Sequence, residues 1–295
     1  MPVASADPVR TDRVAVDALP ADLSAQVAAA VREDVGPGDL SAALIPAQQQ
    51  ARAHVLCREA ATICGAPWFD ETFRQLDRAV AITWRCREGA SVAADSILCE
   101  LAGPARSLLT GERIALNFLQ LLSATATATR LYVAALAGTG CRILDTRKTI
   151  PGLRTAQKYA VRCGGGVNHR IGLYEMVLIK ENHIAAAGSI GAAVSAARAR
   201  EAHGRVEVET ESLEQVREAL DARADIVLLD NFTPAQMRAA VALNRAHAHP
   251  AQLEASGGVT LATVQGIAQT GVDFISVGAL TKNIAAIDLS MRFGF

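Results

Sequence analysis

Residues 205–230 read RVEVETESLEQVREALDARADIVLLD, and this stretch decides the fold. Two short apolar segments, 205–210 and 225–230, enclose a stretch at 213–223 whose apolar residues recur at helical spacing. A strand, a helix and a second strand in this order predict a unit whose two strands run parallel. An acid lies at or next to the end of each strand, Glu209 in the first and Asp230 in the second.

The same unit recurs on both sides of this stretch. Helical, Ala-rich segments at 191–203 and 234–246 alternate with further apolar strands. Apolar runs without alternation are typical of parallel strands that are buried on both faces. Six such strands are predicted at residues 141–146, 176–181, 205–210, 225–230, 252–257 and 273–278.

A doubly wound open sheet and a closed barrel both fit this order, and the strand ends distinguish them. Every predicted strand finishes in polar or Gly-rich residues. An open sheet places its ligand at one switch point, whereas a ring of strands brings all carboxyl ends together. We therefore predict an α/β barrel, and an incomplete one, because six strands are fewer than the usual eight.

The first hundred residues predict a different layer. Helices are expected at 21–33 and 67–76, with Asp22 or Ser24 as a cap, and strands at 51–59, 81–89 and 95–103. Residues 104–136 have helical periodicity with an interruption near Ser123, which predicts two consecutive helices. Residues 1–20 are polar, and we expect them to be flexible.

Composition excludes some classes of partner. The 29 basic and 30 acidic residues of the 295-residue chain give a net charge of −1, so no general attraction to nucleic acid or anionic membrane is expected. No apolar run has the length of a membrane span, and the first residues lack a signal-peptide core. We predict a cytoplasmic protein. Its six cysteines have no metal-site spacing and are expected to be buried free thiols.

Positive charge gathers in one segment, residues 145–183. It contains seven Lys or Arg residues and three carboxylates. Buried cations are costly unless a ligand or partner neutralises them, so this excess predicts a pocket for a small polyanion. The cations are Arg147, Lys148, Arg154, Lys158, Arg162, Arg170 and Lys180.

The residue types at the strand ends suggest separate roles. Arg147, Lys148, Arg170 and Lys180 suit carboxylate and phosphate groups, because Arg grips a carboxylate at two points and Lys is a point charge. Glu209 and Asp230 suit Mg²⁺ and ribose hydroxyls. Small residues let main-chain N–H groups approach phosphate oxygens, and these are Ser256, Gly257, Gly258 and Gly278.

Simpler explanations stay open for several residues. Arg154, Lys158 and Arg162 lie at helical spacing and could be solvated helix surface. Glu209 and Asp230 could cap the helices that follow them. The remaining expectations are a strand-face position for Glu207, a structural role for His183 and a turn at Gly164–Gly166.

Two classes of enzyme and one binding protein fit these residues. The first transfers a phosphorylated sugar, and the second forms a Schiff base at Lys180, as an aldolase does. The third is a barrel that binds an anionic metabolite without catalysis. Permanent cations beside two carboxylates favour phosphoribosyl transfer, because an aldolase needs one lysine made neutral by its surroundings.

Long segments of the chain form a pattern that is more specific than any single residue. Two lie early, EDVGPGDLS at 33–41 and GERIALNFLQLLS at 111–123. The others are DTRKTIPGLRTAQKYAVRCGGGVNHR from residue 145, LIKENH from 178, VEVET from 206, DIVLLDN from 225, LEASGG from 253 and DFISVGALT from 273. Together they resemble the quinolinate phosphoribosyltransferase family over nearly all of the chain beyond the first twenty residues.

The resemblance implies a fold and an activity. The fold would be an N-terminal α/β sandwich domain at 21–116 and an incomplete, TIM-like barrel of about seven strands at 117–282. Residues 283–295 would return to the N-terminal domain. The reaction would join quinolinate to phosphoribosyl pyrophosphate (PRPP), with Mg²⁺, to give nicotinate mononucleotide, pyrophosphate and CO₂. Related proteins that act on nicotinate, or that accompany molybdate transport, are the alternatives.

The resemblance also assigns residues. Thr146, Arg147, His169 and Arg170 would bind quinolinate, together with Arg113 from the partner subunit of a homodimer. Lys148 and Lys180 would contact substrate and phosphates, and Glu209 and Asp230 would lie near the ribose and the metal. The 5′-phosphate loops would be formed by Ser256, Gly257, Gly258 and Gly278.

Overall fold

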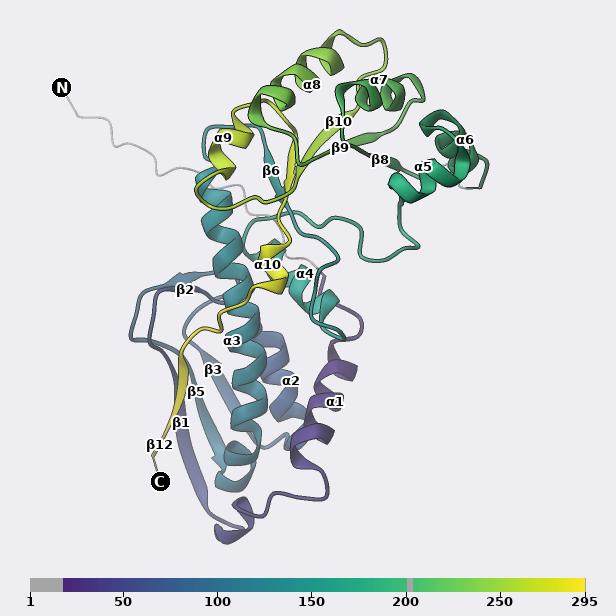
Figure 1. Cartoon of the computed structure of the whole chain (residues 1–295). Coiled ribbons are helices and arrows are strands. Elements are labelled where there is room, and N and C mark those ends of the chain that lie inside the picture. The colour runs from purple at the N-terminus through teal and green to yellow at the C-terminus, as the bar shows by residue number, and fades with distance from the viewer. Residues whose placement is uncertain (1–17, 201–203, 295) are drawn as a thin grey trace, which may run out of the picture.

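The computed structural model describes residues 18–200 and 204–294, and consists of two layers joined by one long helix (Figure 1). The lower layer in Figure 1 holds an antiparallel sheet with helices against it, and the upper one holds a parallel sheet with its own helices. Most of the segment that was predicted to be flexible, residues 1–17 of 1–20, lies outside the described residues.

The N-terminal layer is built on a four-stranded antiparallel sheet in the order β12–β1–β5–β3. Helices α1 (Leu23–Val35) and α2 (Ala66–Leu76) belong to this layer, and Phe69 and Phe73 of α2 fill its core. The last strand comes from the end of the chain and pairs with β1, with Met291 opposite Val55. The strands are β1 (Gln50–Cys57), β3 (Ala81–Trp84), β5 (Ser96–Pro104) and β12 (Leu289–Gly294), with β2 (Ala61–Thr62), β4 (Ser91–Val92) and the short helix η1 (Ala42–Leu44) at the margins.

One uninterrupted helix, α3 (Ala105–Ala135), joins the two layers (Figure 1). The prediction of two helices with a break near Ser123 is therefore wrong. The Ser123 hydroxyl does not compete with the helix, because it accepts a hydrogen bond from the Cys64 N–H at 3.0 Å and donates to the Cys64 carbonyl at 3.1 Å. The predicted domain division after residue 116 falls inside this helix.

The C-terminal layer is a six-stranded parallel sheet in the order β6–β11–β10–β9–β8–β7. Strands β6 and β7 form its two ends and are not paired with each other in the described part of the chain, so the barrel is incomplete, as predicted. The structure has one strand fewer than the resemblance implied. In place of a further strand, Val167 makes a single parallel bridge to Leu144 on the open edge of β6.

Helices follow the barrel strands in the predicted alternation. The strands are β6 (Arg142–Leu144), β7 (Val177–Ile179), β8 (Val206–Thr210), β9 (Ile226–Asp230), β10 (Gln252–Ser256) and β11 (Phe274–Ser276). The helices are α4 (Arg154–Cys163), α5 (Glu181–Ala187), α6 (Ile190–Arg200), α7 (Leu213–Asp221), α8 (Pro234–Ala246), α9 (Val264–Ala268) and α10 (Ala279–Lys282). Within residues 18–200 and 204–294, no helix combines the length and apolar character of a membrane span. All six cysteines are free thiols.

Candidate active site

The carboxyl ends of β6 and β11 lie side by side and bring three predicted site residues together. Gly278 packs closely against the loop that carries Thr146 and Lys148. A side-chain carbon at Gly278 would lie 3.0 Å from Cδ of Lys148 and 3.4 Å from the hydroxyl oxygen of Thr146. Thr146 also accepts a hydrogen bond from the Lys148 N–H at 3.1 Å, and the Thr281 hydroxyl donates to the Lys148 carbonyl at 2.8 Å. The loop that carries Lys148 is therefore held in place by its neighbours, while the Lys148 side chain stays exposed.

A fully buried acid, Asp145, holds the basic segment against β6. Its carboxylate forms an ion pair with Lys158, which is 1% exposed, and accepts hydrogen bonds from the Asn168 side chain at 2.6 Å and the His169 N–H at 2.9 Å. Burial raises the pKa of Asp145 and lowers that of Lys158, and their mutual attraction opposes both shifts. Lys158 is thus a buried structural cation, and the interpretation of it as solvated surface is wrong.

The two other cations of α4 also bond to the main chain. Arg154 donates to the Ile171 carbonyl at 3.2 Å, and Arg162 donates to the Ala18 carbonyl at 2.9 Å. Neither side chain is freely exposed. These contacts tie α4 to the loop that precedes β7 and to the start of the described chain.

Arg147 and Arg170 form a pair of neighbouring cations. Burial and, secondarily, the nearby charge of Arg147 lower the pKa of Arg170, and the charge of Glu207 opposes this shift. Nε of Arg147 is buried and has no hydrogen-bond partner. An unpartnered buried donor beside a second cation is unfavourable without an anion, so this pair has the features of a carboxylate-binding site.

The carboxyl ends of β7, β8 and β9 supply the acidic side of the site. Lys180 and Glu209 form an ion pair in which the Glu209 carboxylate is 15% exposed. Asp230 accepts a hydrogen bond from the Asn231 side chain at 2.7 Å. Neither acid caps a helix, because Ser212 caps α7 and Thr233 caps α8. The explanation of these two acids as helix caps is therefore wrong.

The loop after β10 carries three residues that were predicted to bind phosphate. Ser256 lies opposite Asp230 in the sheet, and its carbonyl accepts the Asn231 N–H at 2.9 Å. Gly257 has φ of 102° and packs against the Asn231 side chain so closely that a side chain there would collide with it. Gly258, with φ of 56°, is exposed and has open space beside it.

The Gly164–Gly166 segment and His183 have structural roles. Added side-chain carbons at Gly164 and Gly166 would collide with Thr129 of α3, so these glycines allow close packing of two segments. Nδ1 of His183 accepts the Lys180 N–H at 3.0 Å at the start of α5. Both observations agree with the structural alternatives that the sequence left open.

His169, Glu207 and Glu254 form a cluster below the strand ends, and of the three only His169 was predicted to belong to the site. Nε2 of His169 lies 2.9 Å from Glu207 and 3.6 Å from Glu254, whose side chains are 0% and 1% exposed. Glu207 was expected on a strand face away from the site, and the structure places it against His169 instead. A cavity of about 380 Å³ in the barrel reaches His169, Arg170 and Glu254.

Two groups have the residue types of a metal site. One is the His169 cluster, and the other is Cys64, Glu88 and Cys163. In the second group the Glu88 carboxylate already accepts the N–H groups of Gly65 at 2.8 Å and Ala66 at 3.2 Å, and burial raises the pKa of the Cys64 thiol. A protonated thiol is a poor ligand, so we assign no metal to that group.

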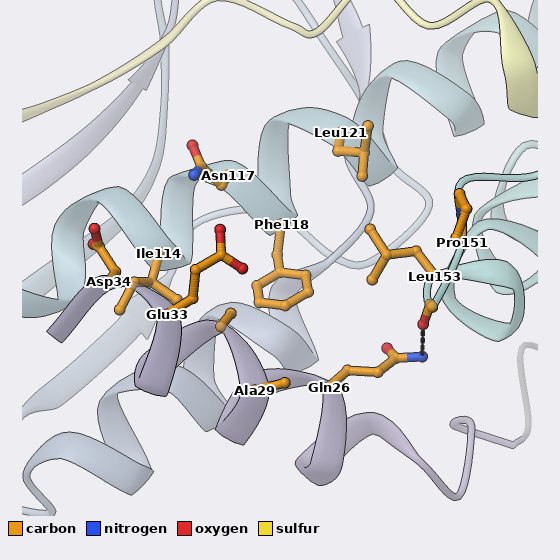
Figure 2. Close-up of a pocket in the computed structure, with 12 residues that line it drawn as sticks. Gln26, Ala29, Glu33, Asp34, Ile114, Asn117, Phe118, Leu121, Pro151 and Leu153 are labelled. Atoms are coloured by element: carbon orange, nitrogen blue, oxygen red, sulfur yellow. Dashed lines mark hydrogen bonds between the residues drawn. The ribbon is translucent and has the colours of Figure 1, made fainter. Parts of the chain in front are cut away.

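Arg113 is exposed on the stretch of α3 whose buried residues Leu108, Ala115 and Leu116 pack in the core of the N-terminal layer. The next turn of the helix borders a groove of about 410 Å³ between α1, α3 and the loop at residues 151–153 (Figure 2). Gln26 crosses to this loop and donates to the Gly152 carbonyl at 3.4 Å. Glu33 and Asp34 line the groove, so it is a poor site for an anion.

Comparison with known proteins agrees with this geometry. The family models for the N-terminal and C-terminal domains of quinolinate phosphoribosyl transferase match residues 39–123 and 125–292. The probable nicotinate-nucleotide pyrophosphorylase (carboxylating) of Bacillus subtilis is 43% identical over 260 residues, which cover 88% of this chain and 89% of that protein. The human enzyme of the same name is 38% identical, with 92% of each chain covered.

Solved structures agree with the sequence matches. The structure of the nicotinate-nucleotide pyrophosphorylase from Francisella tularensis is 44% identical, with a TM-score of 0.90 over 97% of this chain and 100% of that chain. A human nicotinic acid phosphoribosyltransferase at 17% identity and a TM-score of 0.57 shares only the fold. The chain belongs to the quinolinate phosphoribosyltransferase family.

Proposed function

We propose that the protein is a quinolinate phosphoribosyltransferase of NAD biosynthesis. It would convert quinolinate and PRPP to nicotinate mononucleotide, pyrophosphate and CO₂. The observation that carries this proposal is the Arg147–Arg170 pair with its unpartnered buried nitrogen. Two fixed cations side by side match a substrate with two adjacent carboxylates better than a substrate with one.

The remaining strand ends suit the second substrate. PRPP is more highly charged than quinolinate, and both must occupy one chamber, so cations are needed to offset their repulsion. Lys148 and Lys180 would contact the pyrophosphate, and Ser256, Gly257 and Gly278 would supply the loops that bind the 5′-phosphate. Thr146, beside Lys148, would complete the quinolinate side.

Glu209 and Asp230 fit a magnesium ion that is shared with the substrate. They lie at the ends of neighbouring strands and offer only two carboxylates, one of which is paired with Lys180. Mg²⁺ commonly takes one or two carboxylates and completes its shell with phosphate oxygens and water, so this pair suits it. When bound, the ion would offset charge on the departing pyrophosphate.

Catalysis would depend on placement and charge. The quinolinate ring nitrogen attacks C1 of the sugar as the pyrophosphate leaves, so the site must hold the two in line. Glu209 and Asp230 would stabilise positive charge on the ribose, and the lysines would stabilise the leaving group. The nitrogen then carries positive charge, which stabilises the electron pair left on the adjacent ring carbon when CO₂ departs, and that carbon takes up a proton from water to give the product. No covalent enzyme intermediate is needed.

The Schiff-base alternative is less consistent with the surroundings of Lys180. That mechanism needs a neutral amine. In the structure the Lys180 amine is instead paired with the Glu209 carboxylate, which it would have to leave before attacking a carbonyl group. Borohydride trapping of a carbonyl substrate on Lys180 would revive the aldolase hypothesis.

One assay tests the proposed function directly. Protein incubated with PRPP and Mg²⁺ is expected to release pyrophosphate with quinolinate, and far less with nicotinate, and the product mass is expected to be that of nicotinate mononucleotide. A preference for nicotinate would favour the nicotinate-specific alternative. Absence of pyrophosphate with either acid would favour the binding-only alternative.

We further propose that the enzyme works in the cytoplasm as a homodimer in which Arg113 completes the partner's site. The support is the position of Arg113, which is exposed on the stretch of α3 that packs in the core of the N-terminal layer. Inactive Arg113→Ala and Glu209→Gln proteins are expected to regain activity when they are mixed and allowed to exchange subunits. Mixtures that stay inactive, despite proven exchange, would contradict partner donation.

A further inference from the structure

The His169 cluster contains more buried acid than its hydrogen bonds satisfy. Glu207 on β8 and Glu254 on β10, the two strands that flank β9, approach the same imidazole nitrogen. One oxygen of Glu207 and both oxygens of Glu254 are buried without a hydrogen-bond partner. Unpaired carboxylate oxygens in a dry interior call for either a bound cation or a proton.

The hydrogen bonds of His169 decide between these two. Its Nδ1 accepts the Arg170 N–H at 2.8 Å, so this nitrogen carries a lone pair and no proton. The proton of the neutral ring is then on Nε2, which donates to Glu207 at 2.9 Å. A protonated Nε2 cannot bind a metal, so the cluster lacks its third ligand.

A proton therefore satisfies the two acids better than a cation does. In a buried site, ionising the second of two neighbouring carboxylates costs much more free energy than ionising the first. Burial, followed by the charge of Glu207, raises the pKa of Glu254 well above its usual range. Glu207 accepts the hydrogen bond from His169, and the proton lies on Glu254, whose two oxygens have no other partner.

We propose that Glu254 is a positioning residue for the substrate site: it shares its proton with Glu207 and, through Glu207 and His169, holds Arg170 in place. The contacts between Glu207 and His169 and between His169 and Arg170 are hydrogen bonds of the structure. The ligand atoms of Glu254, Glu207 and the His169 ring lie within 4.8 Å of one another. The Arg170 guanidinium is anchored separately, to the Met176 carbonyl at 2.9 Å. The cluster thus orients the main chain from which the substrate-binding cation projects.

Other groups around Glu254 are compatible with this arrangement. The Ser276 hydroxyl lies beside it on β11, and Asp145 on β6 contributes a further repulsive charge. The cations that share a cavity with His169 and Glu254 are Arg142, Arg162, Arg170 and Arg205, and among them the charge of Arg170 is influenced by Glu207 and Arg147. Because Asp145 is already neutralised by Lys158, the excess acid of the cluster resides in the Glu207–Glu254 pair.

The inference rests on the proposed function, since it assumes that Arg170 binds quinolinate. Three variants test it. Glu254→Gln keeps a hydrogen-bond donor to Glu207, whereas Glu254→Leu removes it at similar volume. Thr270→Val is the matched control, because it removes another buried hydroxyl of the barrel domain, one that donates to the Ile267 carbonyl at 2.6 Å.

Quinolinate binding without turnover is measured by calorimetry on the full-length protein. Glu254→Leu is expected to raise the Kd roughly tenfold to a hundredfold, as when an orienting partner is removed from a ligand-binding side chain. Glu254→Gln and Thr270→Val are expected to stay within about threefold of the parent protein. An unchanged Kd in folded Glu254→Leu, or an equal loss in Glu254→Gln, would overturn the proposal.

The imidazole ¹⁵N shifts of His169, assigned with His169→Asn, provide a second measurement that does not depend on activity. The parent protein and Glu254→Gln are expected to show the neutral tautomer with its proton on Nε2. In Glu254→Leu the isolated Glu207 charge is expected to draw a second proton onto the ring. A doubly protonated ring in the parent would overturn the proposal, even if Glu254→Leu did not fold.

These outcomes separate the two hypotheses. A parent protein that neither binds quinolinate nor releases pyrophosphate would overturn the proposed function. The ¹⁵N shifts of His169 would still test the shared proton in that case. A parent protein that turns quinolinate over, with binding indifferent to Glu254→Leu, would leave the function standing and remove the positioning role.

Discussion

Removing the Arg147 guanidinium is the most direct test of the carboxylate site. In the protein without ligand, Nε of Arg147 has no hydrogen-bond partner and the group lies near the charge of Arg170. Arg147→Ala therefore breaks no hydrogen bond at Nε, and it removes the repulsion between the charges of Arg147 and Arg170. The free energy of unfolding is expected to stay the same or to rise slightly.

Binding should respond in the opposite way. Loss of one partner from a buried, hydrogen-bonded charge pair costs about 2–5 kcal/mol. Arg170 remains to neutralise part of the quinolinate charge, so we expect the lower part of that range, about 2–3 kcal/mol, or a roughly 30-fold to 150-fold higher Kd. If Arg147 binds the ground state and the transition state equally, KM rises and kcat changes little.

The assay combines calorimetric titration of quinolinate, steady-state kinetics at saturating PRPP and thermal unfolding. Arg142→Ala is the matched control, because Arg142 lies at the opposite end of the same strand and stacks 4.9 Å above the centre of the Phe274 ring. This control should lose about 0.5–1 kcal/mol of stability and no quinolinate affinity. An Arg147→Ala protein with unchanged Kd, or one that is markedly less stable, would refute the reasoning.

Three further predictions concern the supports of the site. Lys158→Met leaves the buried Asp145 without its cation and should lower the free energy of unfolding, measured in urea, by about 3–5 kcal/mol. Adding Asp145→Asn should recover part of this loss. Equal stability of the single and double variants would contradict a buried ion pair. Gly257→Ala should raise the KM for PRPP more than that for quinolinate, because the methyl group would collide with Asn231 at the phosphate loop; equal effects on both constants would argue against this placement. Burial raises the native pKa of Glu254 well above its usual value of 4.5, so the protein should lose stability as the pH rises from the unfolded pKa towards the native one, and Glu254→Gln should lessen this loss; identical pH profiles would show that the native pKa is not raised.

Much of the barrel could be predicted from local pattern. Apolar runs of strand length, separated by Ala-rich helical segments, indicated all six parallel strands and their order in the chain. Each strand is short and local in sequence, so periodicity and turn residues are enough to find it. The long helix α3 was misjudged for the same reason. A Ser/Thr-rich stretch predicts a break in a helix because its hydroxyls can hydrogen-bond to the helix main chain. The Ser123 hydroxyl instead bonds to the main chain of Cys64, which is distant in the sequence.

The cations that surround the site show a similar limit. Arg154, Lys158 and Arg162 have the same helical spacing, and nothing local distinguishes a solvated lysine from a buried one. Lys158 is buried because Asp145, at the end of the preceding strand, lies where α4 packs. One usable signal was present: Glu207 and Glu254 stand two residues before Glu209 and Ser256, and alternation along a strand places such pairs on the same face.

The alternation of strands and helices, the excess of positive charge at 145–183 and the family of these motifs all follow from local patterns of residues. Tertiary structure alone decided which charges face one another. Hydrogen bonds and desolvation act through space, so whether an Arg lacks a partner, a Lys is buried or an acid keeps its proton depends on residues far away along the chain. The unpartnered Arg147 nitrogen and the Glu207–Glu254 pair are properties of that packing.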